Sequence, residues 1–359
     1  MKQGSVKSII TILAVSSALT AVAGNKDRSG QAGAGELNIN PWARSTGLFG
    51  CNTPYVTGVE AMKSNIAGLA NITGTDIGIS RGEYLSGTGI NINNIAVGQK
   101  LGESGTIGIN LMSMNFGEIT STTYDMPEGL GSFRPQFLNI TLGYAKQFSS
   151  HVNAGAAMTY VTEQVGNIAA LGVAFEGGIQ YVTGKRDNFH FGITLRNLGS
   201  NMRFSGTGFA VNAEKPQSNP SYVVSQQFPA DKFSMPTYLN FGVAYDFYLD
   251  EGHLQKDEVS KHKLTGMFNF QSNSFNNDYL GLGAEYSFKD MVMLRAAYRY
   301  EKGIGNLEKS TTMYSGLALG ATAQKRFGDK GPLVALDYSF RPTQRPANGV
   351  HMFSIRFTR

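Results

Sequence analysis

About fourteen short segments of this chain alternate apolar and polar residues with a period of two. In residues 238–249, for example, every second side chain is bulky and apolar, and most of those between are small or polar. Such a strand offers one face to lipid and the other to a wet or packed lumen. A soluble β-sandwich shows similar alternation, so the connectors and the chain ends must decide between the two folds.

The connectors between these segments favour a transmembrane barrel. Connectors after even-numbered strands are mostly short, and several after odd-numbered strands are long, notably 117–135, 199–236, 301–313 and 342–349. Short periplasmic turns opposite long extracellular loops are typical of outer-membrane barrels. The charged connector 250–260 is an exception on the periplasmic side. The expected strands are 75–84, 87–99, 105–116, 136–148, 151–163, 169–182, 188–198, 237–249, 261–271, 278–288, 291–300, 314–327, 331–341 and 350–359.

The N-terminus carries an export signal. Residues 1–23 contain two lysines, an apolar stretch and a final Ala21-Val22-Ala23, which is typical of a cleaved secretory signal. The single cysteine, Cys51, lies too far downstream to be an acylated first residue, and it excludes an intrachain disulfide. We therefore expect a signal peptide at 1–23, a flexible leader and hatch segment at 24–74, and an outer-membrane barrel at 75–359.

Composition agrees with an all-β transmembrane antiparallel barrel. Charged residues make up 16% of the chain, and it contains 44 glycines, 16 tyrosines and 22 phenylalanines. Glycines fit crowded barrel interiors, and aromatic residues form girdles at the membrane interfaces. The net charge of +5 is spread along the sequence, so we expect outer-membrane lipid around the barrel and no nucleic-acid partner.

The last expected strand is amphipathic, with Phe353, Ile355 and Phe357 on one face. It resembles the C-terminal signal that is read by the outer-membrane barrel assembly machinery. The usual last residue of that signal is aromatic, and here it is Arg359.

Ahead of the first strand, residues 41–50 read PWARSTGLFG and residues 64–70 read SNIAGLA. These two stretches resemble the N-terminal segment of the PorV/PorQ family, FadL-like barrels of the Bacteroidota. Ile66 stands where the family has a proline, which suggests a divergent paralogue. The resemblance implies a barrel of about fourteen strands with an N-terminal hatch in or under the lumen. The matching residues in 41–50 and 64–70 include Pro41, Ala43, Arg44, Gly47, Gly50, Asn65, Ala67, Gly68 and Leu69.

The hatch segment is apolar and rich in glycine but does not alternate, so its large side chains need a place to be buried. A lumen would provide that place. Two interpretations stay open: a hatch with a functional role, and a hatch that only fills space. The side chains in question are Trp42, Leu48, Phe49, Val59, Met62 and Leu69.

Charges of both signs fall on the lumen-facing register of the expected strands. One interpretation is a polar conduit or ligand site, and the other is an ion-pair network that holds a plugged barrel together. The residues are Glu176, His190, Arg196, Asp246, Glu285, Arg295, Arg299 and Asp337.

The sequence carries no pattern for catalysis or for a metal. No Gly-x-Ser-x-Gly, His-Glu-x-x-His or phosphate-binding glycine loop frames any of the five histidines. One cysteine and scattered histidines lack the spacing of zinc ligands. We expect neither an enzyme nor a cofactor.

The loop at 199–236 is unusually long and combines aromatic residues with Ser, Asn, Gln, Gly and Pro. Long irregular loops are often functional, and exposed aromatics are frequent anchors at protein interfaces. A loop folded back over the barrel mouth is the alternative. The aromatic residues are Phe204, Phe209, Tyr222, Phe228 and Phe233.

Three functions compete. The resemblance implies a non-enzymatic component of type IX protein secretion that binds cargo C-terminal signal domains or a translocon or attachment partner. The same architecture implies a FadL-like transporter of hydrophobic small molecules, for which the slips in alternation near Asn93-Asn94 and Leu111-Met112 indicate bulges beside a lateral opening. A general porin ranks last, because glycine and alanine on the lumen face indicate a filled interior.

Overall fold

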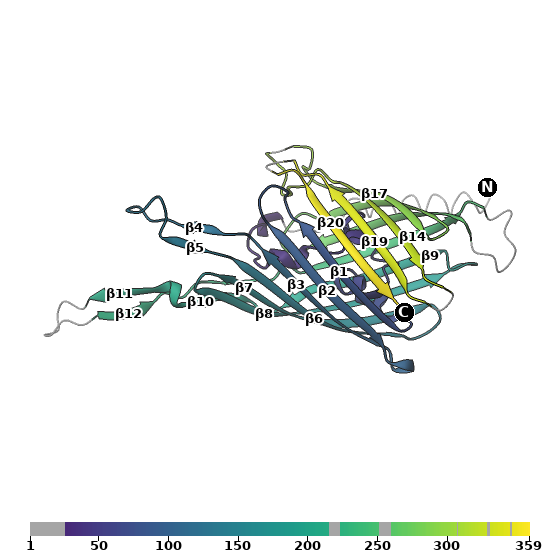
Figure 1. Cartoon of the computed structure of the whole chain (residues 1–359), viewed down its shortest axis with the longest axis horizontal. Coiled ribbons are helices and arrows are strands. Elements are labelled where there is room, and N and C mark those ends of the chain that lie inside the picture. The colour runs from purple at the N-terminus through teal and green to yellow at the C-terminus, as the bar shows by residue number, and fades with distance from the viewer. Residues whose placement is uncertain (1–25, 215–222, 251–259, 307, 329–330, 345–346) are drawn as a thin grey trace, which may run out of the picture.

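The computed structural model describes residues 26–214, 223–250, 260–306, 308–328, 331–344 and 347–359. Fourteen antiparallel strands form a closed barrel, in which β20 pairs with β1 and β9 pairs with both β8 and β14 (Figure 1). The signal peptide expected at 1–23 lies outside the described residues.

All fourteen expected strands are confirmed, and their bounds shift by only a few residues. The barrel strands are β1 (Thr75–Glu83), β2 (Asn91–Lys100), β3 (Thr106–Asn115), β6 (Gln136–Gln147), β7 (Val152–Val165), β8 (Ile168–Thr183), β9 (Phe189–Gly199), β14 (Tyr238–Tyr248), β15 (His262–Asn273), β16 (Tyr279–Phe288), β17 (Val292–Glu301), β18 (Leu317–Arg326), β19 (Leu333–Arg341) and β20 (Val350–Thr358).

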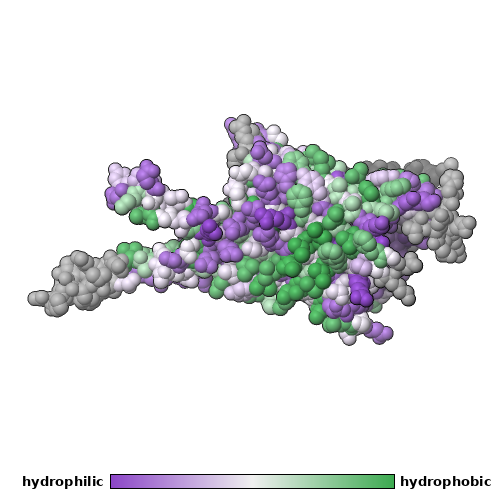
Figure 2. Space-filling view, viewed as in Figure 1, coloured by the Kyte–Doolittle hydropathy of each residue, from purple (hydrophilic) through white to green (hydrophobic). Residues whose placement is uncertain are grey.

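The period-two pattern produces an outer apolar belt and an inner packed face. Along β3, Ile107, Ile109 and Leu111 are exposed on the outside, while Asn110 and Met112 are buried inside. Figure 2 shows apolar residues gathered across the middle of the barrel wall. An outward apolar band of this kind matches the hydrocarbon layer of a membrane. Among the described residues, no helix is long and apolar enough to cross a membrane.

The connectors differ at the two ends as expected. The end that carries Thr75 and Arg359 has mostly short turns, and the backbones of these two residues are hydrogen-bonded to each other. The opposite, outer end carries two projecting hairpins, which extend to the left in Figure 1. They are β4–β5 (Ile119–Ser121 and Gly131–Phe133) and β11–β12 (Ala210–Glu214 and Val223–Gln227).

The segment before β1 fills the lumen as short helices: α2 (Ala43–Thr46), η3 (Gly58–Lys63) and η4 (Ile66–Asn71). Trp42 and Met62 are fully buried there against the barrel wall. Inward glycines make room for them, because a Cβ on Gly78 would meet the Trp42 ring at 2.6 Å and one on Gly108 would meet Met62 Sδ at 2.7 Å. We call residues 41–74 the hatch.

The bulges expected near Asn93-Asn94 and Leu111-Met112 are wrong. Pairing between β2 and β3, and between β3 and β6, is continuous through both sites. The alternation of apolar and polar residues breaks there without a bulge, because the inward Met112 is apolar and packs in a cluster with Ile92 and Met352.

A register shift lies between β8 and β9, where Phe175 faces Leu198 and Gly177 faces Leu195. Glu176 therefore lies opposite both Arg196 and Asn197, which is a β-bulge. Both bulge residues are buried in the lumen, and Asn197 has a φ of 57°. The bulge lets two consecutive polar side chains point inward.

The leader and the long loop are more regular than expected. Ala34 and Leu37 are buried against Met202 and Met235, so residues 34–37 do not behave as a free leader. Ala32 also forms a parallel bridge to Ser234. The loop at 199–236 contains regular elements, namely β10 (Met202–Gly206), η6 (Thr207–Phe209), the β11–β12 hairpin and β13 (Lys232–Phe233). β10 pairs with the outer end of β8 and so lengthens the barrel wall.

Candidate functional site

The hatch is attached to the wall by buried ion pairs. Arg44 Nη2 donates to Glu285 Oε1 at 2.9 Å, and Arg295 Nε donates to the other oxygen of Glu285 at 2.9 Å. Arg295 Nη1 lies 3.7 Å from Asp337 Oδ1. Arg356 of β20 contacts a second hatch residue, since its Nη1 lies 3.6 Å from Glu60 Oε1. The first three contacts join β16, β17, β19 and the hatch in one charge network, and Arg356 of β20 forms a separate pair with the hatch.

A second buried pair lies at the bulge. Arg196 donates from Nε and Nη2 to the two oxygens of Glu176, both at 2.9 Å. Its Nη1 donates to the backbone carbonyl of Lys63 in the hatch and to Tyr238 Oη at 3.2 Å. Asp246 pairs instead with His190, whose Nε2 lies 3.2 Å from Asp246 Oδ2. The lumen charges expected from the sequence therefore lie in separate clusters, with Arg299 apart from all of these carboxylates.

The residues of the resemblance motif form the turns and contacts of the hatch. Asn65 Oδ1 accepts from the Ala67 backbone N–H at 3.2 Å, and its Nδ2 donates to Ile179 O at 3.0 Å. A Cβ on Gly47 would meet the backbone of Gly320 at 3.1 Å. The structure thus gives these positions packing contacts. Pro41, Ala43, Ala67, Gly68 and Leu69 are buried, and Gly50 is half-buried with a φ of 77°.

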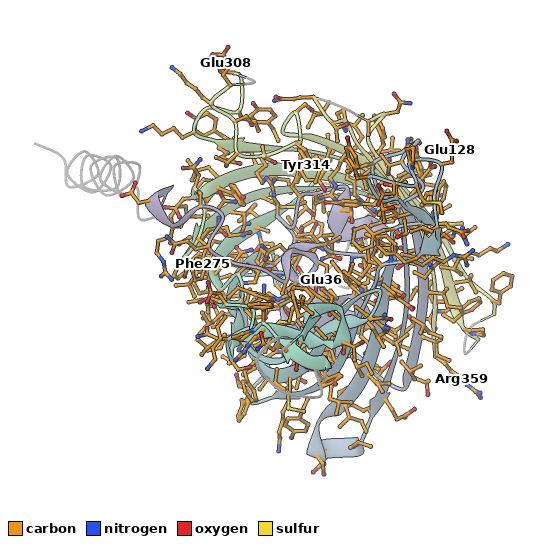
Figure 3. All side chains as sticks on the ribbon, turned by 90° about the vertical axis from the view of Figure 1, so that its left-hand side faces the viewer. Glu36, Glu128, Phe275, Glu308, Tyr314 and Arg359 are labelled. Carbon is orange, nitrogen blue, oxygen red and sulfur yellow. The ribbon has the colours of Figure 1, made fainter. Side chains whose placement is uncertain are left out.

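A cavity of about 380 Å³ lies between the hatch and the outer loops. The hatch residues Ser45 and Thr46 line it, and Asn38 of the leader lines it as well. The barrel wall contributes Asn240 and Gln271. Figure 3 looks at this outer end, where Tyr314, Phe275 and Glu36 are labelled. Sites for small molecules usually enclose roughly 300–1,000 Å³.

Two arginines of the cavity stack on aromatic rings. The Arg299 guanidinium lies 4.2 Å from the Tyr279 ring centroid and 4.7 Å from that of Phe49. The Arg341 guanidinium lies 4.5 Å from the Tyr314 centroid. Such cation–π contacts fix the plane of a guanidinium but leave its N–H donors free.

These cations lack the carboxylate partners of the other lumen arginines. Among the described residues, no carboxylate lies within 4.0 Å of Arg299 or Arg341 or of Lys63, which also lines the cavity. Arg341 Nε, Arg341 Nη2 and Lys63 Nζ are buried without a hydrogen-bond partner. Burial lowers the pKa of Lys63 to about 8, so this ammonium is still charged at neutral pH. The sequence identified Arg299 but missed Arg341 and Lys63.

A smaller cavity of about 180 Å³ adjoins the first at the rim. The leader residues Ala32 and Gly35 line it together with Thr237 and Phe275. The Arg28 guanidinium stacks on the Phe275 ring at 4.0 Å. The leader therefore occupies a slot in the rim between the long loop and the β15–β16 turn.

The loop aromatics do not form a single patch. Phe204 and Phe233 stack with a centroid distance of 5.7 Å and cover the apolar rim cluster around Met202. Phe228 is exposed, and Phe209 is half-buried. Tyr222 lies outside the described residues.

The described residues contain no group of three or more His, Cys, Asp or Glu side chains that could bind a metal ion. Cys51 is a buried free thiol of the hatch.

The fold is similar to that of two solved transporters. The toluene transporter TodX of Pseudomonas putida has a TM-score of 0.53 and 14% identity, covering 89% of this chain and 97% of its own. The toluene transporter TbuX of Ralstonia pickettii has a TM-score of 0.50 and 12% identity, covering 89% of this chain and 98% of its own. No family model and no curated protein matches the sequence.

The chain thus shares its closed antiparallel β-barrel fold with these two proteins. Both neighbours are named as transporters and not as enzymes.

Proposed function

We propose that this chain is a FadL-like transporter that carries small molecules across the outer membrane. The observation that supports it best is the cavity of about 380 Å³ above the hatch, which has the size of a small-molecule site and lies at the outer end of the barrel. The names of the toluene transporters TodX and TbuX point to the same class of function. Hydrophobic molecules are therefore among the first cargo to test.

Transport requires the hatch to move or to rearrange. Trp42, Val59, Met62 and Leu69 fill the lumen below the cavity and are fully buried. The hatch is held by two ion pairs, by side-chain hydrogen bonds such as those from Gln180 to the carbonyls of Thr53 and Val56, and by apolar packing, and the chain joins it to the wall only where it continues into β1. A segment held in this way can shift without breaking the barrel's own hydrogen bonds.

Uptake by a porin-deficient bacterial host tests the proposal. The barrel is expressed in its outer membrane, and accumulation of labelled toluene, laurate, glucuronate and glucose 6-phosphate is compared with the host carrying an empty vector. We expect at least one probe to enter severalfold faster. Equal rates for every probe would argue against transport.

A role in type IX secretion is the second candidate, and it follows from the PorV/PorQ resemblance of the hatch segment. Tyr124, Met126 and Leu130 are exposed on the hairpin at the outer end. Exposed apolar side chains on a projecting element suit contact with another protein. Translocon subunits, attachment partners or cargo C-terminal signal domains would be its ligands.

A pull-down from native outer membranes in mild detergent tests this second role. The control is a variant in which residues 118–134 are replaced by a short Gly-Ser turn. Capture of secretion components by the intact barrel, and their loss with the variant, would favour secretion. Capture of neither subunits nor cargo would weigh against it.

A further inference from the structure

The cavity above the hatch carries more positive charge than its own walls neutralise. Arg299, Arg341 and Lys63 line it, together with the paired Arg196, and no acidic side chain of the described residues does so. Arg44, Arg196 and Arg295 all have a carboxylate oxygen at 2.9 Å. Of the four cations that line the cavity, Arg196 is paired with a carboxylate, and Arg299, Arg341 and Lys63 are not.

The unpaired donors are buried, which makes the absence of a partner costly. Arg341 is 7% exposed and Lys63 is 1% exposed. Lys63 Nζ, Arg341 Nε and Arg341 Nη2 are buried and have no acceptor. A buried charged donor without an acceptor destabilises the protein by its full desolvation free energy. A bound anion would supply that acceptor.

The carboxylates of Glu176 and Glu36 lie near enough to Lys63 to raise its pKa, but neither forms an ion pair with it. The nearby carboxylate of Glu301 has other partners. It follows Arg299 on the inner face of β17, and its Oε1 accepts from Asn277 Nδ2 at 3.1 Å and from Thr311 Oγ1. Its Oε2 has no partner, and Glu301 is not among the residues that line the cavity. It does not form an ion pair with either arginine.

The remaining wall favours a hydrophilic ligand over an aliphatic one. Amide and hydroxyl groups of Asn38, Asn40, Thr46, Ser64 and Asn240 face the cavity. The aromatic rings there are already covered on one face by the guanidinium groups. Most of these groups already bond within the protein, as Asn40 does to Lys63 O and Thr46 to Trp42 O. Asn240 Oδ1 is buried without a partner, and a long alkyl chain would leave it so.

We propose that the cavity above the hatch binds a small hydrophilic oxyanion, a carboxylate or phosphate on a polar body of about the size of a sugar. Arg341 holds the oxyanion through Nε and Nη2, because a guanidinium fixed by ring stacking presents a preformed fork to two oxygens. Arg299 contributes its free Nε, while its Nη2 donates to Thr312 Oγ1 at 3.4 Å. Lys63 approaches from the hatch as a third cation. The inference names the substrate class of the proposed transporter and rests on that proposal.

Calorimetric titration of the full barrel in detergent tests the site. The probes are glucuronate, glucose 6-phosphate and inorganic phosphate, with neutral glucose and laurate as comparisons. We expect at least one sugar oxyanion to bind at least tenfold more tightly than glucose. Glucuronate and glucose 6-phosphate separate a carboxylate site from a phosphate site, and tight binding of inorganic phosphate alone would overturn the sugar-sized ligand.

The matched variants are Arg341→Gln and Arg299→Gln, with Arg203→Gln as the control, because Arg203 is an exposed arginine of β10 outside this cavity. Each variant is first checked for the heat-modifiable gel mobility of a folded barrel. Arg341→Gln should weaken oxyanion binding at least tenfold, and Arg203→Gln should leave it unchanged. Binding unaffected by Arg341→Gln, no binding of any oxyanion, or tighter binding of laurate would overturn the proposal.

The two proposals fail in different ways. Uptake of toluene or laurate without oxyanion binding would keep the transporter and overturn this site. Tight oxyanion binding without uptake of any probe would keep the site and contradict transport.

Discussion

Arg44 of the hatch and Glu285 of β16 are joined by a 2.9 Å ion pair across 241 positions of sequence. Glu285 also accepts from Arg295 of β17. One buried carboxylate thus pairs with two guanidinium groups, one on the hatch and one on the barrel wall. The hatch is held by charge at this point, and packing surrounds it.

Removing that carboxylate should destabilise the barrel markedly. Glu285→Gln leaves the buried Arg44 without its counter-ion and Arg295 with Asp337 alone, at 3.7 Å, and breaking a buried pair costs about 3–5 kcal/mol. The melting temperature from heat-modifiable mobility should fall by several degrees. Arg134→Gln, which breaks the exposed pair with Glu118, should cost less than about 1 kcal/mol. Equal effects of the two variants would contradict the network.

Locking the hatch should stop transport. A Cβ on Gly281 would lie 2.6 Å from Cys51 Sγ, so Gly281→Cys places a second thiol beside the only native one. Oxidation should give a disulfide, visible as a mobility shift on non-reducing gels. Uptake should then fall severalfold and return on reduction. The control is Gly281→Cys with Cys51→Ser, and undiminished uptake by the oxidised barrel would show that the hatch does not move.

The bulge at Asn197 should tolerate glycine better than alanine. Asn197 has a φ of 57°, and its Nδ2 donates to Asn38 Oδ1 and to Pro236 O, both at 3.1 Å. Both variants lose these hydrogen bonds, but only alanine adds left-handed strain of about 1 kcal/mol. In thermal denaturation, the melting temperature of Asn197→Gly should be higher than that of Asn197→Ala. The reverse order would contradict the observed backbone.

Rising pH should loosen the leader. Burial, with the nearby Glu163 carboxylate, raises the pKa of Glu36 to about 8. Between its ordinary value of 4.5 and about 8, the folded state binds more protons than the unfolded one, so stability falls as pH rises through this window. Replacing the ionisable group in Glu36→Gln should remove that contribution.

Melting curves at pH 5 and pH 9 check this sign. The melting temperature of the unmodified barrel should fall over this interval by more than that of Glu36→Gln. Burial also raises the pKa of Glu60 to about 7. Glu60 titrates in both proteins, so its contribution to the change in melting temperature cancels in the comparison. An identical fall in the two proteins would contradict the account.

The sequence predicts the barrel well because alternation is a local property. The strand at 238–248 is visible from its own residues, since Phe241 and Val243 must face away from Asn240 and Asp246. The burial of Trp42 and Met62 also follows from composition, because such side chains need cover. The local pattern therefore predicts whether a side chain faces the lumen or the membrane.

Partners across the lumen are not local and could not be predicted. Nothing in the sequence links Arg44 with Glu285, or Phe49 with Arg299, because the folding of the hatch into the lumen brings both pairs together. The bulge did leave a signal that was missed. Leu195 and Leu198 both face outward with two polar residues between them, which breaks the period of two.

The most direct test of transport is native mass spectrometry of the barrel, released gently from its own outer membrane. The account predicts a barrel that carries one small molecule in stoichiometric amount, an oxyanion that is lost in Arg341→Gln and retained in Arg203→Gln. A barrel that carries no small molecule and instead holds secretion subunits or cargo would contradict it.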